Sequence, residues 1–196
     1  MNFLAHAYLA GSSDQAVVGA LMGDFVKGPV GSDYPTEIAK GLTLHRRIDT
    51  FTDAHVVVRQ SRRRVGPAHR RFAGILVDVF YDHFLARHWD AYHEVPLERF
   101  TARIYCVLGE YQALLPRRLR EMAPRMAAAD WLTSYRHVHA VGIALERIGQ
   151  RLRRGNALLR CAEELLAHYE AFDFDFHAFF PDVVRFARAE RALVEL

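Results

Sequence analysis

The hydrophobic residues of this chain recur every three or four positions, which is the period of an amphipathic α-helix. Residues 41–55 show the pattern most clearly, because Leu44, Ile48 and Phe51 are spaced to share one apolar face. Similar faces, separated by Gly and Pro breaks, follow one another along the chain, and we find no pattern of a βαβ unit. The sequence therefore predicts an all-α fold, a single-domain helical bundle that spans residues 1–196.

Glycine, proline and capping residues give approximate bounds for the expected helices. Ser12 or Ser13 is expected to cap the second helix, which runs to about Val26. Thr36 is expected to cap the third. The other expected helices span 2–10, 68–89, 97–114, 117–128, 131–136, 137–153 and 157–171. Residues 172–180 alternate aromatic and acidic side chains without a partner strand elsewhere, so we expect an extended or helical turn that packs the aromatic rings.

A polar stripe lies directly beside the apolar face of residues 41–55. His45, Asp49 and Asp53 are four residues apart, so one imidazole and two carboxylates line the edge of the buried surface. Hard divalent cations favour oxygen and nitrogen ligands of this kind. Arg46, in the same turn, supplies a planar donor suited to phosphate oxygens. The alternative is an exposed helix on which Arg and Asp side chains pair with one another.

Acids and histidines also lie at the margins of other apolar faces. Asp24 follows the core face of the second helix, Asp78 and Asp82 are one turn apart in the 68–89 helix, and His6 flanks the first apolar face. An acid at such a margin costs desolvation free energy unless an arginine or a metal compensates. Helices that bring their His and Asp residues together build hydrolytic metal centres in helical bundles.

Each of these residues also has an ordinary structural explanation. Asp24 can pair with Lys27, one turn further on, and Asp78 can pair with an arginine. His83 lies inside the apolar arc of its helix, where a hydrogen-bonded core histidine is the commoner outcome. The spacing D-x-x-x-D is common on helices, and the chain contains no H-E-x-x-H, P-loop or G-x-S-x-G motif.

Composition narrows the class of protein further. At 196 residues and 51% hydrophobic, the chain can bury a full core as one domain. It has no apolar run of the roughly 18 residues that a membrane span needs. Cys106 and Cys161 lie alone in helical patterns, so we expect small, unpaired core residues in a reducing compartment. The expected location is cytoplasmic.

Basic residues are concentrated in one segment. Only Lys27 and Lys40 are lysines among 26 basic residues, a ratio to which genomic base composition contributes. The arginines of the segment 59–71, which contains no acid, are Arg59, Arg62, Arg63, Arg64, Arg70 and Arg71. Such a cluster attracts a nucleic acid, a membrane surface or an acidic protein. A simple solvated face is the alternative.

Several longer blocks resemble those of a known family. They are MNFLAH, GALMGDFVKG, GLTLHRRIDTFTD, RRFAGILVDVFYDHFLARHW, WLTSYR and FFPDVVRFA, and together they cover nearly the whole chain. Their order and wording resemble the acyl carrier protein phosphodiesterase family, which is similar to the HD-type metal phosphohydrolases. The resemblance implies an HD-phosphohydrolase-like helical fold and dependence on Mn²⁺ or another divalent cation. It also implies hydrolysis of the phosphodiester between 4′-phosphopantetheine and a serine of holo acyl carrier protein.

The resemblance also implies which residues form the site. The positions that match are His6, Asp24, His45, Arg46, Asp49, Asp53, Asp78, Asp82 and His83. From it we predict that the metal ligands are Asp24, His45, Asp78, His6 and His83, and that the catalytic residues are Asp49, Asp82 and Arg46. The adjacent His-Asp pair of HD proteins is absent, and the nearest adjacent pair is the reversed Asp82-His83. The arginine cluster suits an acidic carrier protein, which long-range steering would attract.

Two other functions remain as alternatives. An HD-type phosphohydrolase that acts on a nucleotide would turn over small substrates without a carrier protein. A non-catalytic adaptor would bind an acidic protein through its arginines, whether or not a metal is present. Nucleic acid is not an expected partner, because few aromatic residues lie among the arginines and no known reader motif is present. A membrane is not an expected partner either.

Overall fold

The structure, a computed structural model, describes residues 1–31, 33–150, 158 and 161–194. These residues form helices and connecting turns, and none of them forms a strand. The helices are α1 (Phe3–Leu9), α2 (Asp14–Met22), α3 (Thr36–Ala54), α4 (Val56–Arg64), α5 (Ala73–Arg87), α6 (Leu97–Glu110), α7 (Arg117–Ala128), α8 (Trp131–Ser134), α9 (Val138–Gly149), α10 (Ala162–Ala167) and α11 (Tyr169–Val194). Short 3₁₀ turns cover Arg70–Phe72, Trp89–Ala91 and Gln112–Leu114. The predicted all-α fold is confirmed.

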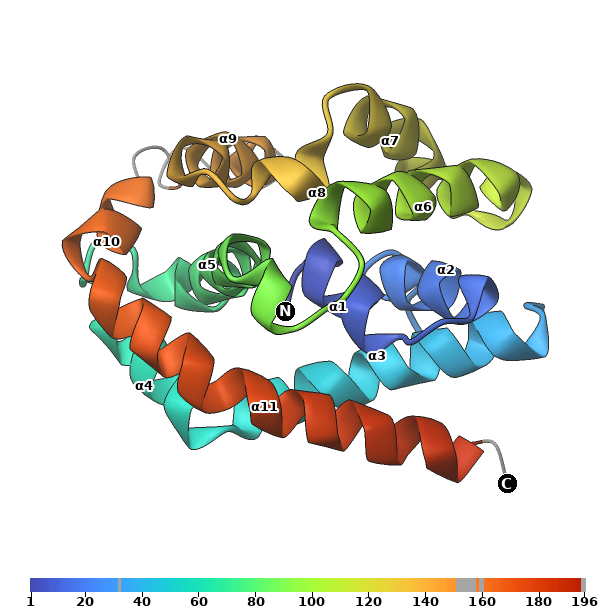
Figure 1. Ribbon diagram of the computed structural model, residues 1–196, viewed down its shortest axis with the longest axis horizontal. Coiled ribbons are helices and arrows are strands. Elements are labelled where there is room, and N and C mark those ends of the chain that lie inside the picture. Colours follow the sequence, from blue (N-terminus) through green and yellow to red (C-terminus); the bar gives the residue numbers. More distant parts are fainter. Residues whose placement is uncertain (32, 151–157, 159–160, 195–196) are drawn as a thin grey trace.

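Helix α1 lies near the centre of the molecule, with α5 on one side and α2 on the other (Figure 1). Four of its seven residues, Leu4, Ala5, Ala7 and Leu9, have at most 1% of their surface exposed. Helices α6 to α9 lie together on one side of this centre, and α3, α4 and α11 lie on the other (Figure 1). The first residues of the chain are therefore surrounded by segments that are distant in sequence.

Helices α2 and α3 pack against each other more extensively than any other pair among the described residues. Two glycines make this possible. A Cβ atom at Gly19 would lie 2.1 Å from the carbonyl oxygen of Ile38, and one at Gly41 would lie 2.2 Å from that of Ala16. The absence of both side chains lets the backbones approach closely, which brings the end of α2 beside His45 on α3.

The tail forms one long helix rather than the expected extended or helical turn. Its buried aromatic residues are Phe172, Phe176, Phe179 and Phe180, all with no exposed surface. Their spacing of four, three and one residues gives a single helical face, whereas Phe174 is 73% exposed. The alternation of Phe and Asp suggested an extended segment, whereas the helical period can be recognised only when residues 172–180 are taken together.

The other predicted bounds hold in part. Ser13 caps α2 by accepting the N–H of Ala16 at 3.3 Å, as expected, but α2 ends at Met22 rather than near Val26. The expected end at 153 and start at 157 lie outside the described residues, and the expected helix to 171 is broken at His168. Cys161 is buried as predicted, but Cys106 is exposed. No helix in the described part of the chain is long and apolar enough to cross a membrane.

The start of α5 shows why one bound was wrong. The expected helix begins at residue 68, but α5 begins at Ala73 after a turn. Glu164 of α10 holds this turn by accepting the N–H of Gly66 at 3.1 Å and by bonding His69 Nδ1 at 2.7 Å. Because this contact comes from a residue almost a hundred positions away, the local pattern did not reveal it.

Candidate functional site

Two histidines and one aspartate meet between α1 and α3. One donor atom each of His6, His45 and Asp49 lies within 4.8 Å of the other two. The Nε2 atoms of His6 and His45 are each 3.1 Å from an oxygen of Asp49, and the two imidazole rings stack with centroids 3.8 Å apart. His6 is 2% exposed and His45 is 4% exposed, whereas the Asp49 side chain is 38% exposed. The group is therefore buried on one side and open on the other.

Asp82 positions His6 by anchoring the first turn of α1. Its carboxylate has no exposed surface and accepts the backbone N–H groups of Leu4 at 2.8 Å and Ala5 at 3.1 Å. Burial raises the pKa of Asp82 to about 7, although the two N–H donors lower it. Because the first N–H groups of a helix lack partners within it, this carboxylate acts as a buried cap from α5. It thereby fixes the helix that carries His6.

Two neighbouring residues orient His45. Its Nδ1–H donates to the carbonyl oxygen of Ala20 at 2.7 Å, so Nε2 points toward Asp49 and toward Asp24, 3.7 Å away. Gly23 gives the ring its space, because a Cβ atom there would lie 2.2 Å from the imidazole carbons. A histidine whose second ring nitrogen is fixed by a carbonyl is a common arrangement for a metal ligand.

The electrostatics of the group favour positive charge at His45 but disfavour it at His6. Burial lowers the pKa of His45, but hydrogen bonds to Asp24 and Asp49 raise it to about 9 overall. Burial and the neighbouring His45 lower the pKa of His6 to about 4. The α-amino group of Met1 is 3.4 Å from Asp49 and 3.2 Å from Asp78. Two cationic groups therefore already lie among these carboxylates.

A cavity of about 370 Å³ opens beside the group. It is lined by Met1, Asn2, Phe3, Asp24, Phe25, Asp49, Asp53, Ile75, Asp78, Val79, Arg118 and Ile148. Four acids thus share one cavity, and burial raises the pKa of Asp78. Arg118 of α7 also lines the cavity, and it is exposed. The cavity, which we call the acidic cavity, places carboxylates and a guanidinium around a space open to solvent.

The donor set fits a divalent cation. Two imidazoles and several carboxylates are ligands that Mn²⁺ and related ions accept. His6 Nδ1 is buried and has no hydrogen-bond partner among the described residues. An unpaired buried nitrogen costs about 1–3 kcal/mol, so this imidazole has a reason to gain a further partner. His6, His45 and Asp49, with Asp24 and Asp78 nearby, are therefore the residues that could hold a metal.

The structure brings together most of the predicted site residues but not all of them. Those that meet at the acidic cavity or beside it are His6, Asp24, His45, Asp49, Asp53 and Asp78. Asp82, predicted as catalytic, is buried and serves as the cap of α1. Arg46, also predicted as catalytic, donates to the carbonyl oxygen of Val26 at 3.0 Å and holds the turn after α2.

His83 lies apart from the group, contrary to its predicted role as a ligand. Its Nδ1–H donates to the carbonyl oxygen of Tyr135 at 2.7 Å, and Nε2 is 2.8 Å from the hydroxyl of Tyr169. Both ring nitrogens thus have protein partners, and the residue has no exposed surface. His83 is therefore a hydrogen-bonded core histidine, which is the alternative that its position in the apolar arc suggested.

Two residues of the candidate site were not predicted from the sequence. Arg118 lies in a run of basic residues on α7 that gave no sign of reaching the acidic cavity. Gly23 precedes Asp24 in the block GALMGDFVKG, so the resemblance contained it without a role. Its close approach to His45 could have been suspected only from knowing that α2 and α3 cross nearby.

The arginine cluster divides into paired and exposed members. Arg62 forms an ion pair with Asp53, and Arg64 pairs with Asp175 of α11 at 2.9 Å. The exposed members are Arg59, Arg63, Arg70 and Arg71. Asp53 lines the acidic cavity, so its ion pair with Arg62 places the arginines of α4 next to that cavity.

A second group of histidines and an acid lies at the surface. His88, at the end of α5, bonds Asp173 of α11 at 2.8 Å, and His177 Nε2 lies 3.6 Å from the same oxygen. The Nδ1 atom of His177 is 2.7 Å from the hydroxyl of Tyr92. The side chains of His88 and Asp173 are each 28% exposed. None of these residues lines the acidic cavity.

Comparison with known proteins adds the family context. Residues 1–183 match the family described as acyl carrier protein phosphodiesterase. A protein of that name from Pectobacterium atrosepticum is 33% identical over 192 residues, which cover 97% of this chain and 100% of the relative. Relatives of the same name from Klebsiella pneumoniae (35% over 188 residues, 95% and 97% of the two chains) and Salmonella dublin (35% over 194 residues, 98% and 100%) are also similar. No solved structure matches, so the expected likeness to HD-type phosphohydrolases stays a prediction.

Proposed function

Since this chain belongs to the acyl carrier protein phosphodiesterase family, we propose that it is a metal-dependent enzyme that removes 4′-phosphopantetheine from holo acyl carrier protein. Water adds to the phosphorus, the bond from phosphorus to the serine oxygen breaks, and the serine oxygen gains a proton. The products are apo acyl carrier protein and free phosphopantetheine. The observation that carries the proposal is the buried His6–His45–Asp49 group beside an acidic cavity, in a chain that matches the family over nearly its full length.

The metal would be held by His6, His45 and Asp49, with Asp24 and Asp78 as further carboxylates. When bound, a divalent cation such as Mn²⁺ supplies charge that polarises a phosphoryl oxygen and lowers the pKa of a water molecule. Asp82 acts at a distance, because it caps α1 and so keeps His6 in place. Gly23 acts in the same indirect way on His45. Both are positioning residues rather than catalytic ones.

Substrate contacts would come from the walls of the acidic cavity. A phosphodiester carries negative charge, which the carboxylates alone would repel, so cationic groups in the cavity lining are needed to hold it. Arg118 meets this requirement, since it lines the cavity and is exposed. A guanidinium matches the geometry of phosphate oxygens and can offset the charge that develops on them. We assign it this role in preference to Arg46, which is occupied by Val26.

The acidic carrier protein would dock on the surface beside the cavity. Arg59 and Arg63 are one turn apart on α4 and exposed, and Arg62 connects that helix to Asp53 at the cavity rim. A basic surface next to the active site steers an acidic partner by long-range attraction, mainly through the association rate.

Mass spectrometry of holo acyl carrier protein incubated with the protein tests the proposal. With Mn²⁺ present, we expect the carrier protein to lose the mass of phosphopantetheine, and with excess chelator we expect no loss. Conversion that continues at full rate in chelator would overturn the metal dependence. Hydrolysis of nucleotides with no conversion of the carrier protein would instead indicate a nucleotide phosphohydrolase.

A further inference from the structure

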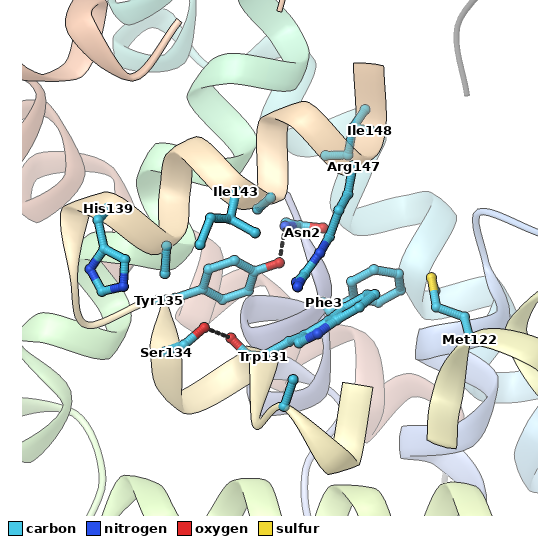
Figure 2. Close-up of a pocket in the computed structure, with 13 residues that line it drawn as sticks. Asn2, Phe3, Met122, Trp131, Ser134, Tyr135, His139, Ile143, Arg147 and Ile148 are labelled. Carbon is cyan, nitrogen blue, oxygen red and sulfur yellow. Dashed lines mark hydrogen bonds between the residues drawn. The ribbon is translucent and has the colours of Figure 1, made fainter. Parts of the chain in front are cut away.

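A second cavity, of about 280 Å³, adjoins the acidic cavity. It lies between the start of α1, the end of α7, and helices α8 and α9 (Figure 2). Asn2, Phe3 and Ile148 line both cavities. An extended molecule that places its phosphate in the acidic cavity therefore reaches the second cavity directly across these three residues.

The second cavity differs sharply in chemistry from the first, since no acid among the described residues lines it. Its walls include the apolar side chains of Phe3, Met122 and Ile143, and the Arg147 guanidinium lies 4.2 Å from the centre of the Trp131 ring (Figure 2). The apolar part of this lining favours a ligand with methyl and methylene groups.

Polar groups are spaced within these apolar walls. The side-chain amide of Asn2 donates to the hydroxyl of Tyr135 at 3.1 Å (Figure 2). The Nε1–H of Trp131 is buried and has no acceptor among the described residues. An indole N–H is a donor only, so an unpaired one in a cavity wall favours a ligand that brings a carbonyl oxygen.

From these observations we propose that the second cavity binds the pantetheine arm of the substrate. This assignment rests on the proposed function, which supplies a phosphodiester with an arm on one side and a protein on the other. The arm is an uncharged chain of methyl-bearing and methylene carbons with two amides, which matches a lining of apolar side chains and few hydrogen-bonding groups. The carrier protein then lies on the open side of the acidic cavity, near the arginines of α4.

The test uses pantetheine alone as a probe, so that binding is measured apart from turnover. Ile143 lines the cavity and is 41% exposed, so Ile143→Trp fills the space without disturbing the core. We expect calorimetric titration of the wild-type protein with pantetheine to show binding, and the variant to bind at least about tenfold more weakly. Leu166→Trp, at a 60% exposed position that does not line the cavity, should bind like wild type.

A conservative variant tests the proposed hydrogen bond. Trp131→Phe keeps an aromatic ring under Arg147 but removes the N–H donor, so we expect pantetheine affinity to fall about fivefold. Equal binding of pantetheine to wild type, Ile143→Trp and Trp131→Phe would overturn the assignment, as would a complete lack of binding to wild type.

Turnover separates this assignment from the proposed function. Ile143→Trp should raise the KM for holo acyl carrier protein while hydrolysing a small phosphodiester without the arm, such as bis(p-nitrophenyl) phosphate, at the wild-type rate. An unchanged KM for holo acyl carrier protein would overturn the pocket assignment alone. If pantetheine binds as expected but wild type converts no carrier protein, the proposed reaction fails while the pocket stands.

Discussion

Two groups in this protein contain the same residue types in similar spacing. His45 and Asp49 are one turn apart on α3 and are joined by His6 from α1, just as Asp173 and His177 are one turn apart on α11 and are joined by His88 from α5. In the surface group, His88 is hydrogen-bonded to Asp173, and His177 is hydrogen-bonded to the hydroxyl of Tyr92. In the buried group, the imidazoles are stacked, an Nδ1 atom lacks a partner, and further carboxylates line an adjacent cavity.

Because the two groups share residue types and spacing, these features do not by themselves select either one as a metal centre. What distinguishes the buried group is that the fold desolvates its histidines and fixes their orientation through Asp82, Ala20 and Gly23. His88 and His177 are more exposed than His6 and His45, so water satisfies part of their hydrogen-bonding capacity. Burial combined with incomplete pairing is therefore the better indicator of function.

Replacement of matched aspartates should give the largest contrast. Asp49→Asn removes charge that a cation needs, so we expect release of phosphopantetheine to fall by several orders of magnitude. Asp173→Asn alters the equivalent position of the surface group and should leave turnover close to wild type. Both rates can be followed by mass spectrometry of the carrier protein. Near-normal turnover by Asp49→Asn, or a large loss in Asp173→Asn, would reverse the functional ranking of the two groups.

A change of one methyl group should disturb the buried group almost as strongly. Gly23→Ala places a Cβ atom where the His45 ring now lies, so the imidazole must move. A displacement of about 1 Å at a reacting centre can reduce the rate about a hundredfold. Gly109→Ala, on α6, is the matched control, because a Cβ atom there meets nothing within 4 Å. Equal steady-state rates for both variants would show that the position of His45 does not limit catalysis.

Metal binding should stabilise only through the buried group. A ligand present at a hundred times its Kd stabilises the folded state by about 2.7 kcal/mol. We expect Mn²⁺ to raise the Tm of wild type and Asp173→Asn by similar amounts, and that of Asp49→Asn far less. Thermal scans with and without Mn²⁺, starting from chelator-treated protein, measure this. Chelator itself should leave the helical circular dichroism largely intact, because the extensive hydrophobic core contains none of the candidate ligands. An equal rise in all three proteins would disprove specific binding at Asp49.

Local features of the fold could be predicted from the sequence more readily than contacts between distant segments. The apolar period was sufficient for the all-α fold and for most helices, because each period is a local property. The stripe of His45 and Asp49 on one helix was equally visible. The position of His6 beside these two residues could not be predicted, because it depends on Asp82, which caps α1 from 78 residues away. The resemblance supplied His6 without this physical reason.

Residues whose roles depend on a partner were the hardest to predict. His83 and Arg46 match the family positions, yet backbone carbonyl groups of Tyr135 and Val26 are their partners in the fold. No helical wheel contains that information, because both carbonyls belong to other segments. Arg118 was missed for the reverse reason, since the sequence of its own helix gave no hint that it lines the acidic cavity.

The surface that surrounds the buried group should affect association more than chemistry. Arg59→Glu combined with Arg63→Glu reverses two exposed charges on α4, and we expect the second-order rate with holo acyl carrier protein to fall about tenfold at low salt. Arg99→Glu with Arg188→Glu makes the same change of net charge at exposed positions on α6 and α11. Stopped-flow measurement over a range of salt concentrations distinguishes local steering from net charge. Identical rates for the two double variants would limit the effect to net charge.

The smallest expected effect is on stability, and it concerns the contact between His69 and Glu164. Like the surface group, this contact has its hydrogen-bond partners within the protein. Glu164 bonds His69 Nδ1 and the N–H of Gly66, and these bonds lower its pKa although burial raises it. A carboxyl with a lowered folded-state pKa stabilises the protein above its unfolded pKa of 4.5, and this contribution is lost as pH falls through the folded value. Glu164→Gln should therefore cost about 1 kcal/mol near pH 7, with the deficit shrinking below pH 4.5. Denaturant unfolding of both proteins at pH 7 and pH 4 measures the difference.

Turnover should be unchanged at pH 7, because this contact fixes the turn before α5 and none of its members lines the acidic cavity. A deficit that is independent of pH would assign the role of Glu164 to packing rather than to charge.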